Sequence, residues 1–297
     1  MKPARKAKHD LDFSFVNAAS LVLPPRELTR LYLVGCGGTG SWIAPALARL
    51  AAVLVESSQA VEVTFIDPDQ VERGNVPRQN FAFSEIGQHK AASLTRRFSS
   101  KWGVEIGAIC ERFEASMVES GQGELTVIVG AVDNPQARSK ISSAVIPHYD
   151  LFGYSRSAST WWLDCGNHED AGQVLLGNAG HADHLKGAFH TPRMCIALPS
   201  PALQSPELII DAKKKPVRKA PSCAELMLEN AQSLTVNQRV AAEASDYLMR
   251  MLTGRPLKRF QTWLDLEAGT SRSVYITPEN VARVIEMPAS FVMKGNK

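Results

Sequence analysis

Four glycines lie within six residues between an apolar run and a stretch of helical character, at Gly35, Gly37, Gly38 and Gly40. A glycine-rich turn from a strand into a helix lets backbone N–H groups approach a phosphate, which the helix N-terminus also attracts. An acidic residue, Asp67, closes the next apolar run, where a carboxylate can accept hydrogen bonds from ribose hydroxyls. This combination predicts a nucleotide site, although a glycine turn without any ligand has the same local pattern.

The segment after Asp67 favours a triphosphate over a dinucleotide. A triphosphate carries about four negative charges, and attack on it requires cations where charge accumulates. We expect Arg78 and Lys90 to neutralise phosphates, and Asn75 and Gln79 to orient them. A dinucleotide that reacts at its nicotinamide ring needs few cations beyond a helix N-terminus. These residues therefore count against an NAD(P)-dependent oxidoreductase, which is the alternative from a different class.

A metal ligand is predicted at the end of the apolar run 125–133. Asp133 ends this run and Asn134 follows it. Mg²⁺ prefers hard oxygen ligands, commonly one or two carboxylates together with phosphate oxygens. In an open α/β sheet, ligands bind at the carboxyl ends of the strands, where Gly38, Asp67 and Asp133 all fall. We therefore expect Asp133, with Asn134 beside it, to hold Mg²⁺ next to bound ATP.

Alternating strands and helices have to position these residues. Short apolar runs separated by amphipathic stretches are typical of βαβ units and a mostly parallel sheet. We expect strands over 31–35, 61–67, 104–109, 125–133, 159–166 and 173–177, and helices over 38–55, 85–102 and 135–145. A helix pair over 224–254 and two strands within 259–277 follow. The predicted fold is α/β: a Rossmann-like, doubly wound sheet with a C-terminal antiparallel extension and a crossover loop.

The chain length of 297 residues allows one or two domains. The motifs favour a single nucleotide-binding domain with additions at both ends. We expect an N-terminal extension (1–25), an adenylation core (26–177), a crossover or flexible loop (178–222), and C-terminal helices with a β-hairpin that complete the same domain (223–297). The loop is rich in Gly, Pro, His and Ser, and a segment of this length inside a compact protein is usually functional or flexible.

The composition excludes several classes of protein. With 44% hydrophobic and 21% charged residues, the chain is neither disordered nor a coiled coil. The 33 basic and 30 acidic residues leave a net charge of +3, which is too small to indicate nucleic-acid binding. The longest apolar stretch, 43–55, contains Arg49 and is shorter than the ~20 residues that cross a bilayer. Five widely spaced cysteines without a CxxC pair fit a reducing compartment, so we expect a cytoplasmic protein.

Cys223 is the cysteine with the clearest chemical potential. It precedes a predicted helix and follows the basic run 213–221, a setting that lowers the pKa of a thiol and increases its thiolate fraction. We therefore hypothesise that Cys223 is a nucleophile, with an inert cysteine at a loop–helix junction as an equal alternative. Cys36 and Cys165 fit buried packing, and Cys195 is a weaker nucleophile candidate.

Taken together, these motifs resemble the adenylation domain of the ThiF/HesA/MoeB and ubiquitin-activating-enzyme superfamily. The resemblance rests on GCGGTG, the run D-x-D-x-V-E-x-x-N-x-x-R-Q, the helix lysine, and V-D-N after an apolar strand. It covers 31–177 and resumes over 223–277. The run that begins at Asp67 is specific to this superfamily, whereas the glycine motif also occurs in other proteins. The subtype is most similar to the ThiF-like proteins of bacterial PRTRC gene clusters.

The resemblance implies an adenylating enzyme that uses ATP and Mg²⁺. Its substrate would be the C-terminal glycine carboxylate of a ubiquitin-like protein or small carrier protein, activated as an acyl adenylate with release of pyrophosphate. In some members a cysteine at the position of Cys223 then takes the acyl group, and Arg78 and Lys90 would act at the phosphates. Adenylation of another substrate, such as a tRNA base, is the close alternative.

The chain departs from the family pattern at its N-terminal side. In relatives an R-x-x-R-Q-type segment before the first strand supplies a phosphate-contacting arginine across a homodimer, and this segment is missing here. Arg26 or Arg30 would have to substitute, so a homodimer is left open. The paired zinc CxxC motifs are also missing, and the helix between Gly40 and Asp67 is longer than usual. A nucleotide-bound scaffold without turnover is therefore a further alternative.

Overall fold

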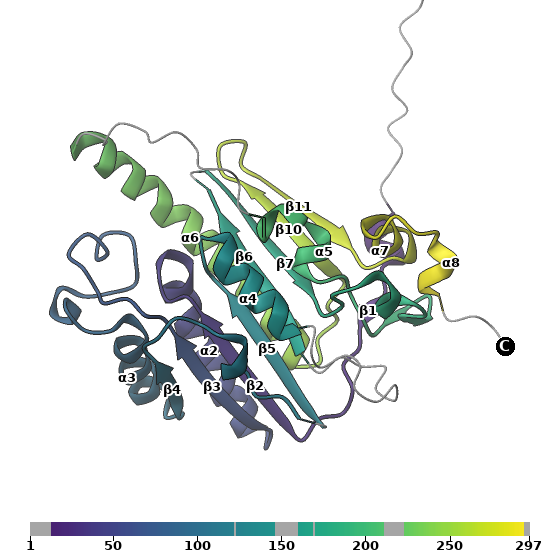
Figure 1. The fold of residues 1–297 in the computed structure, drawn as a ribbon, viewed down its shortest axis with the longest axis horizontal. Coiled ribbons are helices and arrows are strands. Elements are labelled where there is room, and N and C mark those ends of the chain that lie inside the picture. The colour runs from purple at the N-terminus through teal and green to yellow at the C-terminus, as the bar shows by residue number, and fades with distance from the viewer. Residues whose placement is uncertain (1–12, 122, 146–159, 169, 211–222, 294–297) are drawn as a thin grey trace, which may run out of the picture.

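A computed structural model describes residues 13–121, 123–145, 160–168, 170–210 and 223–293, with the backbone alone over 223–234. Its centre is an eight-stranded sheet with the strand order β11-β10-β7-β6-β5-β2-β3-β4 (Figure 1). The strands are β2 (Leu28–Val34), β3 (Ala60–Ile66), β4 (Ile106–Ile109), β5 (Glu124–Gly130), β6 (Thr160–Asn167), β7 (Ala171–Gly177), β10 (Arg259–Asp265) and β11 (Thr270–Tyr275).

The sheet has a parallel part and an antiparallel part. Strands β4, β3, β2, β5 and β6 pair in parallel. Strands β7, β10 and β11 continue the sheet in antiparallel pairs. The parallel strands read as continuous apolar runs because both of their faces are covered. The predicted Rossmann-like α/β fold with an antiparallel extension is confirmed.

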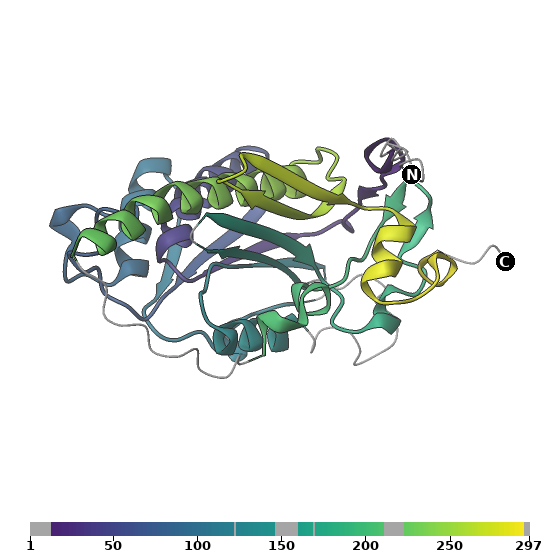
Figure 2. The same ribbon diagram turned by 90° about the horizontal axis from the view of Figure 1, so that it is seen from above.

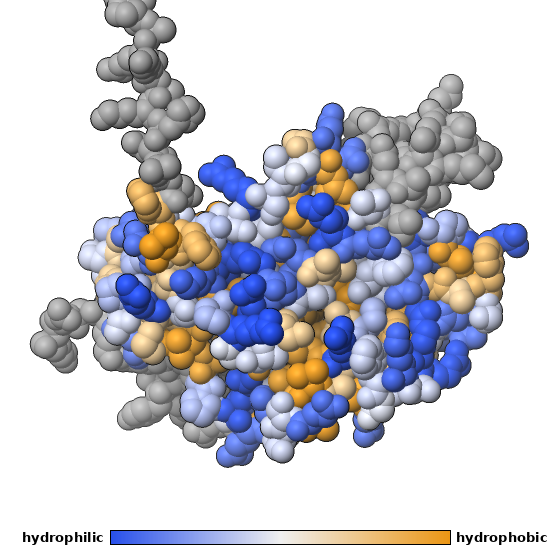
Figure 3. Space-filling view, turned by 180° about the vertical axis from the view of Figure 1, so that it is seen from behind, coloured by the Kyte–Doolittle hydropathy of each residue, from blue (hydrophilic) through white to orange (hydrophobic). Residues whose placement is uncertain are grey.

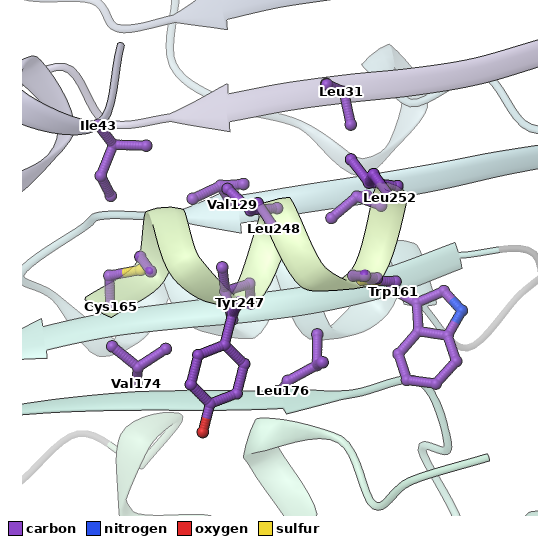
Figure 4. Packing of buried hydrophobic residues seen from close by; sticks show 14 of the residues in the cluster. Leu31, Ile43, Val129, Trp161, Cys165, Val174, Leu176, Tyr247, Leu248 and Leu252 are labelled. Atoms are coloured by element: carbon purple, nitrogen blue, oxygen red, sulfur yellow. The ribbon is translucent and has the colours of Figure 1, made fainter. Parts of the chain in front are cut away.

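Helices cover both faces of the sheet, which gives three layers (Figure 2). One face carries α2 (Gly38–Glu56), α3 (Lys90–Trp102) and the C-terminal part of α6 (Cys223–Leu252), and the other carries α4 (Pro135–Val145) and the short α5 (Pro201–Gln204). In Figure 4, Leu248 and Leu252 of α6 lie among apolar strand residues such as Leu31, Val129 and Trp161, all within one buried cluster.

Helix α2 is a core element of this fold. Among the described helices, α2 alone has the length and hydropathy of a membrane span. It packs against α6 and the sheet, and residues such as Ile43, Leu47 and Leu54 are 0–1% exposed. Its apolar character is therefore explained by burial inside the protein. The outer face of α2 and α6 mixes polar and apolar residues (Figure 3), with a groove of about 300 Å³ that Leu50, Trp102 and other side chains line.

Two predicted helices differ from the structure. The predicted pair over 224–254 is one continuous helix, α6. Thr235 and Val236 have a lower helix propensity, but α6 contains no Gly or Pro that would break the helix. The helix predicted from residue 85 begins at Lys90. Backbone hydrogen bonds between Val71 and residues 87–88 hold the preceding residues against another segment, which delays the helix start.

A smaller group of elements packs against the end of the sheet that lies opposite the glycine turn. It contains α1 (Ser14–Asn17), α7 (Pro278–Val284), α8 (Ala289–Val292) and a three-stranded sheet of β1 (Ser20–Leu21), β9 (Met194–Cys195) and β8 (Phe189–Thr191). Between these elements lies a cavity of about 550 Å³, lined by residues that include Val16, Arg193, Thr277 and Met293. None of the predicted site residues lines this cavity.

Candidate nucleotide site

The glycine turn depends on close backbone contacts between β2, α2 and Ala131. Gly35 has a φ of +90°, and a Cβ at this position would lie 2.5 Å from the carbonyl oxygen of Ala131. A Cβ on Gly40 would lie 1.8 Å from the carbonyl oxygen of Gly35. Both positions require glycine because backbone atoms occupy the space of a side chain. A Cβ on Gly37 would meet no described atom within 4 Å, so the start of α2 borders open space.

Asp67 connects the glycine turn to the segment after β3. Its Oδ2 accepts a hydrogen bond from the N–H of Cys36 at 2.6 Å, and its Oδ1 accepts one from the N–H of Asp69 at 2.8 Å. The residue is 5% exposed. Burial raises the pKa of its carboxyl, and the two N–H donors oppose that shift. Asp67 therefore lies beside the turn, where the sequence placed it, and helps to build the turn.

Lys90 supplies a buried cation at the same edge of the sheet. The residue is 6% exposed, and its Nζ lies 3.0 Å from Oδ2 of Asp69. Its backbone N–H also donates to the carbonyl oxygen of Asp69 at 2.9 Å. The side chain of Asp69 is 65% exposed, so the ammonium is paired at the boundary with solvent. Its position suits neutralisation of a bound anion.

Residues 75–80 dock onto the first turn of α2. The N–H of Asn80 donates to Oγ of Ser41 at 3.0 Å, and its Nδ2 donates to the carbonyl oxygen of Ser41 at 3.1 Å. Two segments that are about 40 residues apart in sequence are thereby held together at the glycine turn. Arg97 donates in addition to the carbonyl oxygen of Asn80. This docking brings the predicted phosphate residues to the start of α2.

Within this segment, one predicted residue builds the turn and two present free polar atoms. Oδ1 of Asn75 accepts a hydrogen bond from the N–H of Glu72 at 2.9 Å, and its carbonyl oxygen accepts from the N–H groups of Arg78 and Gln79. Nε of Arg78 and Oε1 of Gln79 are buried and have no hydrogen-bond partner among the described residues. Such groups are costly in a folded protein unless a ligand or a water molecule supplies a hydrogen bond.

Asp133 and Asn134 lie exposed between β5 and α4. Nδ2 of Asn134 donates to Oδ1 of Asp133 at 3.2 Å, and Oδ1 of Asn134 accepts from the N–H of Ala137 at 2.8 Å, capping α4. Asp133 follows Ala131, which contacts Gly35, by two residues. No group of three metal-binding side chains occurs in the part of the chain that the structure describes. A Mg²⁺ ion held by Asp133 would take its other ligands from phosphates and water, which is its common mode of binding.

A buried ion pair behind Asp133 was not anticipated from the sequence. Nε of Arg138 lies 2.9 Å from Oδ1 of Asp164, which is 0% exposed. Burial raises the pKa of the Asp164 carboxyl, and Arg138 opposes that shift. Asp164 is the register partner of Gly130, the last residue of β5. The pair therefore fixes the first turn of α4 directly after Asp133.

A second unanticipated residue, Asn237, comes from α6. Its Oδ1 accepts hydrogen bonds from Oγ1 of Thr39 at 2.9 Å and from Nδ2 of Asn167. A Cβ on Gly38 would lie 2.7 Å from its Nδ2. Asn237 and Thr39 are 198 residues apart, and no local pattern marks the asparagine as part of a nucleotide site. Contact between α2 and α6 alone brings it there.

Three buried cysteines are poor nucleophiles. Cys36, Cys165 and Cys195 are 0–2% exposed. Burial raises the pKa of all three thiols, that of Cys195 to about 12. Cys195 is thus protonated at neutral pH, which argues against its candidacy. Cys223 opens α6, but its side chain lies outside the described residues, as does the basic run 213–219.

Neither candidate substitute for the missing family arginine lies at this chain's own site. Arg30 forms ion pairs with three carboxylates at the amino end of the sheet, those of Glu62, Glu119 and Glu124. Arg26 donates to Oγ1 of Thr29 at 2.9 Å. Both arginines precede or begin β2, whereas the glycine turn follows its carboxyl end. Within one chain, they therefore lie at the opposite edge of the sheet.

A profile of the ThiF family matches residues 26–258, more than half of the chain. The chain belongs to the ThiF family. Among solved structures, this ThiF family protein is similar to PaaA, with 17% identity, a TM-score of 0.53, and coverage of 84% of this chain and 64% of that chain. It is also similar to E. coli MccB solved with ATP, with 15% identity, a TM-score of 0.53 and the same coverage. No curated protein matches the chain.

These comparisons confirm the resemblance to the family. The chain spans less than two thirds of the length of the solved structures, and at such identity their likeness shows the fold alone. MccB has also been solved with MccA and AMPCPP, at 15% identity and a TM-score of 0.51. The comparisons therefore establish the family and the fold of this protein. The PRTRC subtype stays a prediction.

Proposed function

We propose that this ThiF family protein uses ATP and Mg²⁺ to adenylate the C-terminal carboxylate of a ubiquitin-like or other small carrier protein. The proposal rests on one observation: a buried cation and buried polar atoms without a described partner lie near the glycine turn. Lys90 is buried there, and Arg78 and Gln79 each present a buried polar atom without a described partner. The structures of MccB with ATP and with MccA lend support from a related fold.

In the proposed reaction, a carboxylate oxygen attacks the α-phosphorus of ATP. The bond from that phosphorus to the oxygen bridging to the β-phosphorus breaks, and pyrophosphate leaves with the electron pair. Two anions have to approach each other, so Lys90, Arg78 and the N–H groups at the start of α2 would stabilise the charge. Bound Mg²⁺, held by Asp133, would supply Lewis-acid stabilisation. The carboxylate of Asp67 accepts two N–H bonds and retains acceptor sites for ribose hydroxyls.

Transfer of the acyl group to Cys223 is the second part of the proposal. Its thiolate would attack the acyl carbonyl carbon, and AMP would leave with the electrons of the broken C–O bond. Helix α6 is continuous from Cys223 to Asn237, which places these backbone positions about 21 Å apart at 1.5 Å rise per residue. Because Asn237 lies against Gly38, transfer requires the first turns of α6 to move toward the glycine turn.

The decisive experiment is exchange of radiolabelled pyrophosphate into ATP, with purified ubiquitin-like proteins that end in glycine as carboxylate donors. We expect exchange that depends on the donor and on Mg²⁺. The variant Asp133→Ala should lose it, whereas Asp183→Ala, which removes an exposed carboxylate in the 3₁₀-helix Ala182–Leu185, should not. Wild-type exchange in Asp133→Ala would refute the metal assignment. If only tRNA stimulates exchange, the substrate is a tRNA base and not a protein. If the protein binds ATP but catalyses no exchange with any donor, it is a nucleotide-bound scaffold without turnover.

A further inference from the structure

We propose that the side-chain amide of Asn237 contacts the phosphates of the bound nucleotide, an inference that rests on the proposed function. Asn237 is 3% exposed and lies where α6 meets the start of α2. Both hydrogen bonds described for its side chain are accepted by Oδ1, from Thr39 on α2 and from Asn167 at the end of β6. The two donors from separate elements fix the orientation of the amide.

The fixed orientation places both polar atoms of the amide beside the glycine turn. A Cβ on Gly38 would lie 2.7 Å from Nδ2 and 2.9 Å from Oδ1, so the amide packs directly on the Cα of Gly38. Nδ2 carries two N–H donors, and neither has an acceptor among the described residues. Gly38 is the first residue of α2, whose free N–H groups and positive dipole end attract an anion. Unused donors of a nearly buried side chain thus lie beside the first residue of α2, where the proposed nucleotide would place a phosphate.

A substitution of Asn237 by aspartate can distinguish a phosphate contact from a purely structural role. In Asn237→Asp, one carboxylate oxygen can still accept the bonds from Thr39 and Asn167. The other oxygen replaces the N–H donors beside Gly38 with a negative charge. The dipole of α2 favours an anion there, so the variant should fold with undiminished stability. A bound triphosphate, in contrast, would lose a donor and meet a like charge.

The test compares ATP with adenosine, because only ATP carries phosphates. We would measure both affinities by equilibrium dialysis in excess Mg²⁺ for wild type, Asn237→Asp and Gln238→Glu. The last variant makes the same amide-to-carboxylate change on the next, exposed residue of α6. A hydrogen bond to a charged group corresponds to about 10- to 100-fold in affinity. We expect Asn237→Asp to weaken ATP binding at least tenfold and adenosine binding less than threefold, with an unchanged Tm and no effect of Gln238→Glu.

Several results would overturn the inference. If Asn237→Asp binds ATP within threefold of wild type, the amide does not contact phosphate. If ATP and adenosine weaken equally, or if Tm falls with both affinities, Asn237 only shapes the turn. In these cases wild type still binds ATP, and the proposed function survives. If wild-type protein binds no ATP, the proposed function fails together with this inference.

Discussion

Removal of the arginine from the Arg138–Asp164 pair should leave an uncompensated buried charge. The carboxylate of Asp164 is 0% exposed, and its Oδ2 has no hydrogen-bond partner among the described residues. Nε of Arg138, which donates to Oδ1 at 2.9 Å, is the charged group that compensates this carboxylate, and the side chain of Gln173 adds an uncharged hydrogen bond. Breaking such a pair by removing one partner costs about 3–5 kcal/mol, whereas replacing both partners by apolar residues is often neutral or stabilising. At pH 7 we therefore expect Arg138→Met to cost about 3–5 kcal/mol of unfolding free energy. We expect the double variant Arg138→Met/Asp164→Leu to be as stable as wild type or more stable.

The cost of Arg138→Met should depend on pH in a defined direction. Burial already raises the pKa of Asp164 above its ordinary value of 3.8, and loss of Arg138 removes the opposing influence. A carboxyl whose folded-state pKa is raised contributes stability below its unfolded pKa and loses it as pH rises through its folded pKa. Each pKa unit corresponds to 1.36 kcal/mol, so lowering the pH from 7 to 5 recovers up to about 2.7 kcal/mol. The destabilisation is therefore largest at neutral pH.

Urea unfolding followed by tryptophan fluorescence at pH 5 and pH 7 measures this effect. The matched control is Arg96→Met, which makes the same change at an exposed arginine of α3 and should cost less than ~0.5 kcal/mol. The reasoning is refuted if Arg138→Met costs less than ~1 kcal/mol at pH 7, or an equal amount at both pH values. It is equally refuted if adding Asp164→Leu to Arg138→Met fails to restore stability.

Two further predictions concern the glycine turn and the cysteines. Gly40→Ala places a Cβ against a backbone carbonyl and should lower the free energy of unfolding in urea by at least ~3 kcal/mol. The matched variant Gly37→Ala, whose Cβ meets no described atom within 4 Å, should lower it by less than ~1 kcal/mol. Similar losses in the two variants would contradict the geometry of the turn. Iodoacetamide at pH 7.5 should leave Cys36, Cys165 and Cys195 unmodified in the folded protein and modify all three in urea, as mass spectrometry of peptides would show. Rapid labelling of Cys195 in the folded state would disprove its burial.

Local signals explain why the sheet and the glycine turn could be predicted from sequence. β2 and β5 are continuous apolar runs, and each lies between two neighbouring parallel strands. The glycines at Gly35 and Gly40 are required by contacts within a few residues of the turn and with Ala131. The start of α3, by contrast, depends on hydrogen bonds between Val71 and residues 87–88, which no helical periodicity reveals.

Long-range contacts explain what the sequence did not show. Asn237 reaches the turn because α2 and α6 pack side by side, and its partner Thr39 is 198 residues away. Arg138 and Asp164 are ordinary charged residues in the sequence and become a buried pair only when α4 packs on β6. Periodicity shows which face of an element is apolar, but it contains no information on which polar side chain a distant element will meet.

The predicted ligand residues also include groups that build the site itself. Asp67 accepts the N–H of Cys36, Asn75 accepts the N–H of Glu72, and Asn134 caps α4. A carboxylate or amide oxygen satisfies a backbone N–H by the same chemistry with which it would bind a hydroxyl or a cation. Residue type and spacing therefore cannot separate the two uses. The described hydrogen bonds identify the groups that build the turn, and the proposals made above assign to a ligand the donors of Asn237 beside Gly38 and the buried polar atoms of Arg78 and Gln79.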